Sequence, residues 1–241
     1  GLSLVEWVRY AYFGFELVLA ISIPILMQIR HKHVFNVKDK KEWCNFLIAL
    51  PFVLVLMMPP YVLQSIIGFT SIRTEVGSAY HIIWVLITLV VIIALYYIFR
   101  FKEYKSRYML CVFMTIALFY HYNSVFLMGF TLPRLPIQLC NLAAYLYMVA
   151  IIFKRQRLFG FCALANIAGA IVAIVLSDFS DGAFSFWNIH FLYEHSLVLA
   201  IPALALGLRI FPKIDKKAIK YSFIGFSIYF IFCFVFGTIL N

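Results

Sequence analysis

Residues 187–211 read WNIHFLYEHSLVLAIPALALGLRIF, a run that is long enough and apolar enough to cross a lipid bilayer. A helix needs about 20 mostly apolar residues to span the hydrocarbon layer. The first third of this run nevertheless carries His190, Glu194 and His195. Ionisable side chains inside a membrane are costly, and they usually face a polar cavity or one another. The run therefore indicates both a membrane-spanning fold and a candidate site within it.

The composition of the whole chain is that of a membrane protein. Of its 241 residues, 65% are hydrophobic and only 12% are charged, and the mean hydropathy is +0.97. A soluble globular domain is about half apolar and one quarter charged. This charged fraction is too small to cover the surface of a water-soluble protein. We therefore expect a single transmembrane domain over residues 1–241.

Eight segments are candidates for crossing the bilayer: about 8–29, 45–68, 81–99, 108–130, 136–153, 158–177, 187–211 and 219–240. Backbone polar groups in hydrocarbon must be bonded within their own element, which favours helices at these lengths. We therefore expect an all-α, polytopic membrane helical bundle of about eight transmembrane helices. The segment 158–177 is rich in Gly and Ala, a composition typical of helices that pack closely.

The basic residues alternate between the two sides of this bundle. Seventeen of the 20 Lys and Arg residues lie in the connections after the first, third, fifth and seventh segments. The exceptions are Arg9, Arg73 and Arg134. Connections rich in Lys and Arg remain in the cytoplasm, so we expect both termini outside. Because the net charge of +10 is spread over four separate connections, we expect no nucleic-acid binding.

With this orientation, polar side chains from several segments share a level in the outer half of the bilayer. A rise of 1.5 Å per residue places His195 about 12 Å, and Cys140 about 6 Å, below the outer face. The others near this level are Glu16, His121, Asn123, Gln138, Asn141, His190 and Glu194. This agreement in depth predicts an outward-facing polar pocket. Each residue alone could instead be a packing contact, and His190 and Glu194, four residues apart, could simply pair.

A thiol and an imidazole at one depth can form a nucleophile and its base. The thiolate is the reactive form, so Cys140 needs a base, and His195 is the candidate, with His190 or Glu194 to orient the imidazole. The amide N–H groups of Asn141 and Gln138 could stabilise an oxyanion. At the depth of the outer leaflet's ester carbonyls, such a group suits acyl transfer through a Cys thioester.

The remaining cysteines give no sign of other chemistry. Cys44, Cys111, Cys162 and Cys233 lack the spacing of a metal site or a disulfide framework. We interpret Cys111, Cys162 and Cys233 as small apolar fillers of the core. We expect neither a metal nor an organic cofactor.

The stretches LPIQLCNLAAYLY, FKRQRLFG and HSLVLAIPALALGL resemble the YwaF-like bacterial integral membrane family. The usual pattern of that family is LPLHLCxL, followed roughly fifty residues later by a helix with His ahead of an apolar run. The family is similar to animal transmembrane protein 164, regarded as a cysteine-dependent acyltransferase that remodels ether phospholipids. The resemblance spans roughly 130–240, and it implies Cys140 as nucleophile, His195 as base and a bacterial plasma membrane as location.

This sequence departs from the family pattern at one position of the LPLHLCxL motif. It also matches only the start of a second motif near the C-terminus. Gln138 stands where the family often has His. The C-terminal FGTILN resembles the start of the family's GTNY stretch, which implies that the natural chain continues beyond Asn241.

We therefore expect an acyltransferase or transacylase that moves a fatty acyl chain from a phospholipid to a lysolipid or lipoprotein acceptor. Arg134, at the outer mouth of the pocket, is a candidate for binding a lipid phosphate; its other reading is a snorkelling interface anchor. One alternative is a proton-coupled transporter that uses Glu16, His121, His190 and Glu194, although no inverted repeat is visible. The other is a non-catalytic membrane assembly partner whose polar layer serves helix packing.

Overall fold

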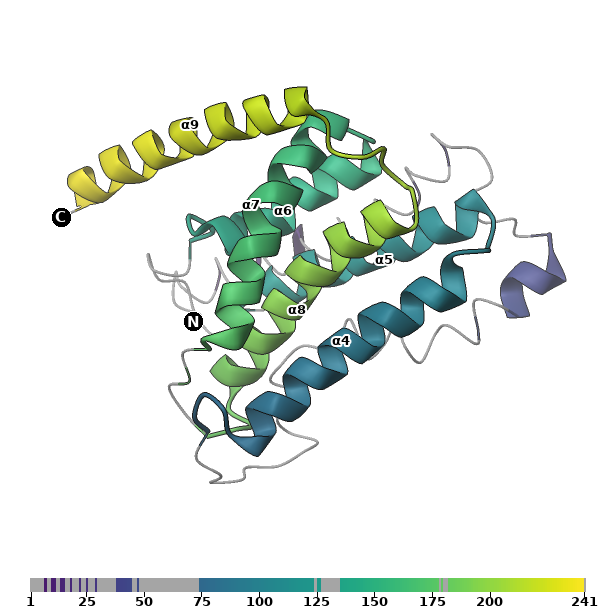
Figure 1. Ribbon diagram of the computed structural model, residues 1–241, viewed down its shortest axis with the longest axis horizontal. Helices are drawn as coiled ribbons and strands as arrows, with labels where there is room; N and C mark the ends of the chain where they lie inside the picture. The colour runs from purple at the N-terminus through teal and green to yellow at the C-terminus, as the bar shows by residue number, and fades with distance from the viewer. Residues whose placement is uncertain are drawn as a thin grey trace.

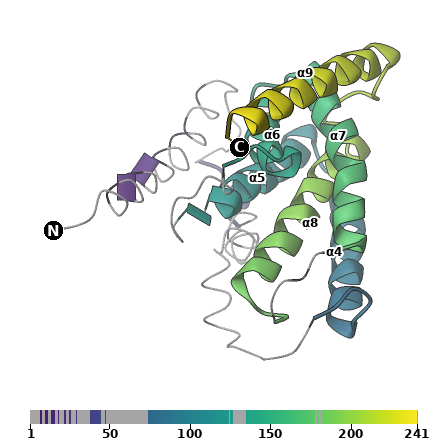
Figure 2. The ribbon, with the colours of Figure 1, turned by 90° about the vertical axis from the view of Figure 1, so that its left-hand side faces the viewer.

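The computed structural model describes residues 74–123, 125–126, 135–177, 179 and 182–240, together with 38–44 and separate positions between 7 and 47. The long helices of this part are shown in Figures 1 and 2 and keep the labels of Figure 1. They are α4 (Ala79–Phe99), α5 (Tyr104–Asn123), α6 (Leu139–Ile152), α7 (Gln156–Val175), α8 (Phe186–Gly207) and α9 (Lys216–Leu240).

These helices overlap the last six expected segments and differ from them in extent. Helix α5 begins at Tyr104 and ends at Asn123, whereas the sequence predicts a span over 108–130, of which 124 and 127–130 lie outside the described residues. Helix α8 ends at Gly207, four residues before the expected end of its segment. Helix α6 has 14 residues, which is shorter than the roughly 20 that a full crossing needs. Within the described residues, α4, α7, α8 and α9 are long and apolar enough to cross a membrane.

The expected spans 8–29 and 45–68 lie outside the described residues, apart from isolated positions. The count of eight spans and the placement of both termini outside therefore stay predictions. The described part nevertheless confirms an all-helical membrane protein, because its helices are of the length and composition that the bilayer requires.

Helix α8 is the central helix of the described bundle. It contacts α4, α5, α6 and α7, whereas α9 packs chiefly against α7. Figure 1 shows α4 running beside α8 and α9 lying along the outer edge of the molecule. The hydroxyl of Ser196 links α8 to α4, because it accepts from Trp84 Nε1 at 3.0 Å and lies 2.9 Å from Thr88 Oγ1. A hydrogen bond of this kind joins helices where lipid supplies no alternative partner.

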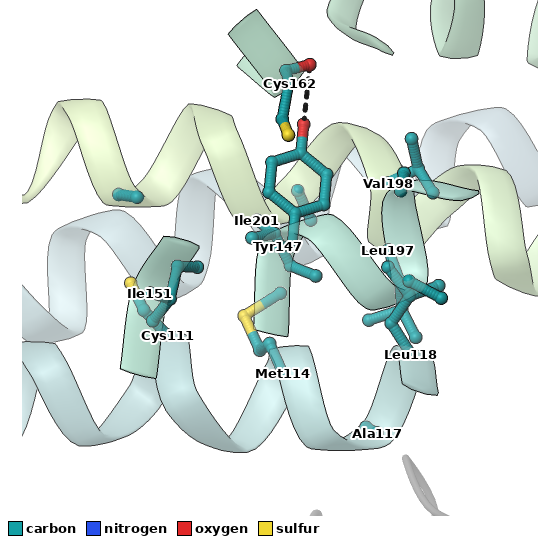
Figure 3. Close-up of a cluster of buried hydrophobic side chains, with 14 of the residues drawn as sticks. Cys111, Met114, Ala117, Leu118, Tyr147, Ile151, Cys162, Leu197, Val198 and Ile201 are labelled. Carbon is teal, nitrogen blue, oxygen red and sulfur yellow. Dashed lines mark hydrogen bonds between the residues drawn. The ribbon is translucent and has the colours of Figure 1, made fainter. Parts of the chain in front are cut away.

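The core between α5, α6, α7 and α8 consists of buried aliphatic, aromatic and small side chains, part of which is drawn in Figure 3. Tyr147 is fully buried in it, and its hydroxyl donates to the carbonyl of Cys162 at 3.1 Å. This bond satisfies a phenol that would otherwise be buried without a partner. Cys111 and Cys162 are fully buried there, which confirms them as core fillers. Cys233 is instead half-buried on α9.

Small residues let α9 approach α7 closely. A Cβ atom placed on Gly225 would lie 2.8 Å from the ring of Phe161, and one on Gly160 would lie 3.2 Å from Ala218 Cβ. Both distances are shorter than ordinary contacts, so glycine is required for this separation. The close packing expected for the Gly- and Ala-rich segment 158–177 is therefore confirmed on the side of α7 that faces α9.

The basic connections of the described part meet at one end of the bundle. Lys154, between α6 and α7, lies over the rings of Tyr104 and Tyr108 at 5.1 and 4.6 Å from their centroids. Arg107 of α5 donates from Nη1 to the carbonyl of Leu208, at the end of α8, at 2.7 Å. These contacts join the α4–α5, α6–α7 and α8–α9 connections, as the alternation of charge predicts.

Helices α4 and α9 present apolar side chains to their surroundings. In α4 the buried residues are only His81 and Thr88, and along α9 exposed aromatic and aliphatic residues predominate. Such a surface would be unfavourable in water, but it matches the hydrocarbon of a bilayer. These two helices therefore form lipid-facing surfaces of the described bundle.

Replacing Gly225 by Leu is expected to destabilise the protein by about 1–3 kcal/mol, because the added side chain must displace Phe161 and separate α9 from α7. Gly237→Leu is the matched control, since a Cβ there meets no atom within 4 Å. Equilibrium unfolding in mixed micelles measures both variants. Equal stability of the two would contradict the close α7–α9 contact.

Candidate functional site

The site begins at the carboxyl end of α5, in the sequence Tyr120–His121–Tyr122–Asn123. His121 is fully buried, and its ring stacks on that of His190 with centroids 4.9 Å apart. Its Nε2–H donates to the backbone carbonyl of His190 at 3.3 Å. The carbonyl can only accept, so this bond places the proton of the neutral imidazole on Nε2. His121 thereby fixes the position of α8 relative to α5.

His190 and Glu194 form a buried polar pair on α8. His190 Nε2 lies 3.5 Å from Glu194 Oε2, and the two residues are only 7% and 3% exposed. On its other face, the His190 ring stacks on Phe186 with an interplanar angle of 4°. His190 Nδ1 and Glu194 Oε1 make no hydrogen bond to any described residue. The pair thus retains polar groups that can bind a substrate or a proton.

Cys140 lies in the first turn of α6, where it is partly buried. Its thiol lies 3.3 Å from Asn141 Oδ1 and 3.9 Å from Gln138 Oε1, two possible acceptors. The backbone N–H groups of Cys140 and Asn141 are also within hydrogen-bonding reach of the sulfur. The amino end of a helix carries a partial positive charge. These N–H groups can therefore donate toward the sulfur.

Tyr122 and Glu194 connect the thiol to the buried pair. The Tyr122 hydroxyl is hydrogen-bonded to the side chain of Asn141, beside Cys140. Glu194 lies near enough to both Cys140 and Tyr122 to interact with them electrostatically. The structure therefore brings α5, α6 and α8 together around one polar cluster. Its sequence-predicted members are His121, Cys140, Asn141, His190 and Glu194.

His195 follows Glu194 on α8 and is therefore turned by about 100° from it around the helix axis. Its Nδ1–H donates to the carbonyl of Phe191 at 2.7 Å, and its ring lies 4.2 Å from that of Phe191. His195 is 6% exposed and interacts electrostatically with His190. It thus adjoins the cluster, and its pairing with Cys140 stays a prediction.

The remaining sequence-predicted site residues lie at the edge of the cluster or outside the described residues. Gln138 is exposed at the start of α6. Arg134 and Glu16 lie outside the described residues, so their proposed roles stay predictions as well. Among the described residues, no group of three or more His, Cys, Asp and Glu side chains could hold a metal ion.

Sequence reasoning missed three tyrosines of the cluster. Besides Tyr122, Tyr145 of α6 donates from its hydroxyl to Asn123 Oδ1 of α5, and the ring of Tyr193 lies 4.4 Å from that of His121. The chain has 15 Tyr, most of which can be read as interface residues. Their sequence positions relative to His121, Cys140 and His190 were the available signal. This signal can be interpreted only when it is known which helices pack together.

Fold and surface together define a polytopic helical membrane protein. The chain belongs to the TMEM164 family, whose model matches residues 76–241. The matched region contains α4 to α9 and every described member of the polar cluster. No curated protein and no solved structure matches this chain.

The pair of His190 and Glu194 is expected to show strong energetic coupling. His190→Phe keeps a stacked ring but leaves Glu194 without its polar partner, and Glu194→Met does the converse. Each single change should cost about 1–3 kcal/mol of unfolding free energy. The double variant should cost less than the sum by about 0.5–3 kcal/mol.

The control cycle combines Glu194→Met with Tyr147→Phe, whose hydroxyl bonds to Cys162 in the apolar core. These two effects should add to within about 0.5 kcal/mol. Unfolding in mixed micelles measures both cycles. Additivity of His190→Phe and Glu194→Met would show that the two side chains do not interact.

Proposed function

We propose that this protein is a membrane acyltransferase or transacylase in which Cys140 carries the acyl chain as a thioester. The observation that supports this function best is the position of the Cys140 thiol. It lies at the amino end of α6, within reach of two backbone N–H groups and beside the buried cluster of Glu194 and Tyr122. A nucleophile, hydrogen-bond donors and titratable groups therefore share one region of a membrane protein.

The reaction has two balanced steps. In the first, the Cys140 sulfur attacks the ester carbonyl of a phospholipid and its proton passes to the base; the C–S bond forms and the ester C–O bond breaks. The base returns the proton to the departing oxygen, which releases a lysophospholipid. In the second, an acceptor hydroxyl or amine attacks the thioester, loses its proton to the base, and the thiolate is protonated again.

His195 is the proposed base, because the bond from its Nδ1–H to Phe191 fixes the tautomer. In this tautomer Nε2 carries the lone pair that accepts a proton. His190 and Glu194 supply the polar surroundings of the sulfur on the same helix. The N–H groups at the start of α6, with Asn141 and Gln138 beside them, can donate to the oxyanion of each tetrahedral intermediate.

The location of the cluster suits a lipid substrate. The cluster lies where α5 ends and α6 and α8 begin, far along the helices from the basic connections. With those connections in the cytoplasm, the cluster lies in the outer half of a bacterial plasma membrane, at the level of ester carbonyls. The binding of the lipid phosphate by Arg134, expected from the sequence, belongs to this proposal. The acceptor is a lysolipid or the amino terminus of a lipoprotein.

The nucleophile is tested by incubating the purified protein with phospholipid and measuring its intact mass. We expect an acyl adduct that maps to Cys140 and that hydroxylamine removes, as it does other thioesters. Cys140→Ser should lose this adduct and at least 100-fold of the acyl-transfer rate. Cys44→Ser, at an exposed cysteine, is the control and should retain both. A transporter or an assembly partner would instead tolerate Cys140→Ser, and a fully active variant would overturn the proposal.

The base is tested by comparing His195→Gln with His190→Gln. Loss of a general base is expected to slow thioester formation by about 100- to 10,000-fold, and we expect this for His195→Gln. His190→Gln should have a smaller effect, because it changes only the surroundings of the sulfur. Stopped reactions analysed by mass spectrometry give both rates. The reverse order would assign the base to His190 and leave the role of Cys140 unchanged.

A further inference from the structure

Helix α6 begins without a side-chain cap from its own sequence. Gln138 occupies the N-cap position, but its side chain makes no capping hydrogen bond. The first helical bond joins the Leu142 N–H to the Gln138 carbonyl at 2.8 Å. The N–H groups of Leu139, Cys140 and Asn141 therefore have no partner within the helix. The N–H groups of Cys140 and Asn141 are within reach of the Cys140 sulfur. The N–H group of Leu139 then remains to be paired.

Tyr229 of α9 reaches this end of α6. Its hydroxyl donates to the carbonyl of Ile137 at 2.8 Å and lies near the Leu139 N–H. The hydroxyl thus anchors the backbone directly before the N-cap residue. The same hydroxyl lies near Cys140 and near Cys233, one turn further along α9. The cap therefore lies directly beside the proposed nucleophile.

The close contact between α9 and α7 fixes the position of this hydroxyl. Gly225, which packs against Phe161, lies four residues before Tyr229 and eight before Cys233. Residues at this spacing share one face of a helix, so the face of α9 that touches α7 also carries Tyr229. The middle of α9 thereby reaches the start of α6, where Tyr229 bonds to Ile137. The small residues of α7 and α9 thereby determine where the cap falls.

We propose that Tyr229 is a positioning residue, whose hydroxyl caps α6 and holds the Cys140 and Asn141 N–H groups toward the sulfur. The purpose of this positioning rests on the proposed function, whereas the contact between Tyr229 and the start of α6 is independent of it. Without the hydroxyl, the backbone that leads into α6 loses its hydrogen bond to α9 at Ile137. The turn then frays, and the N–H groups cease to stabilise the thiolate.

The test measures the reactivity of the thiol directly, so it does not require acyl transfer. The full chain in phospholipid nanodiscs is treated with N-ethylmaleimide, and alkylation of each cysteine is followed by peptide mass spectrometry. Tyr229→Phe removes the hydroxyl and keeps the ring. We expect alkylation of Cys140 to become about two- to fivefold slower, the factor that a helix terminus contributes. The exposed Cys44 is the internal reference and should react at an unchanged rate.

The matched control is Tyr221→Phe, on the same helix, where the tyrosine ring lies beneath Arg157. It should leave the alkylation of Cys140 unchanged. Hydrogen–deuterium exchange is the second measurement: Tyr229→Phe should speed exchange in the peptide covering 137–142 and leave α8 unaffected. This pattern would support the cap even in a variant of lowered stability.

Equal alkylation rates for Tyr229→Phe and the parent protein, or equal slowing by Tyr221→Phe, would overturn the positioning role. The two proposals fail separately. Slower alkylation in Tyr229→Phe, with no acyl adduct on the parent protein, would retain the cap and reject the acyltransferase. An acyl adduct on Cys140 that forms equally fast in Tyr229→Phe would retain the enzyme and reject the cap.

Discussion

The structure depends on bringing buried polar side chains together inside the bundle, because the surrounding hydrocarbon offers no hydrogen bonds. This constraint is most demanding where α5, α6 and α8 meet. His121 is bonded and stacked against His190, and His190 is in turn paired with Glu194. The carboxylate then lies near the thiol of Cys140. The contact that fixes the helices relative to one another is therefore also the contact that assembles the candidate site.

The apolar half of the bundle supports the polar cluster by packing the helices that carry it. Towards the basic end, α5 to α8 pack through side chains such as Tyr147, whose one polar atom is satisfied by a backbone carbonyl. This region has well-packed contacts and few titratable groups, so it holds the helices at a constant separation. The polar residues lie beyond it, in the half where α6 and α8 begin. The fold thus separates a rigid support from a region with reactive groups.

Family membership and local geometry contribute differently to the proposed function. Membership of the TMEM164 family covers the helices that carry the cluster, but it does not by itself assign a reaction to this chain. The geometry adds a thiol at a helix amino end, the side chain of Glu194 near it, and a tyrosine from α9 that bonds to the backbone before α6. The proposed acyl transfer rests on this geometry.

The sequence by itself determined the membrane class and the order of the helices, and it indicated that the polar residues of α5, α6 and α8 share one level. These inferences use local properties: hydropathy over 20 residues, the alternation of basic connections and a fixed rise per residue. The six described helices overlap the expected segments, although α6 has only 14 residues. Position along a helix is therefore readable from sequence, whereas rotation about its axis is much less so.

Only the tertiary structure decided which faces meet. Glu194 and His195 are neighbours in sequence with the same hydropathic context, but they point about 100° apart, and the structure brings Glu194 near Cys140. Tyr122, Tyr145 and Tyr229 could not be distinguished from the other tyrosines of the chain, because their partners come from other helices. A contact between distant segments depends on how helices rotate and cross. In this protein, side-chain packing sets the rotation and crossing of the helices. Gly225, for example, lets α9 approach α7 closely.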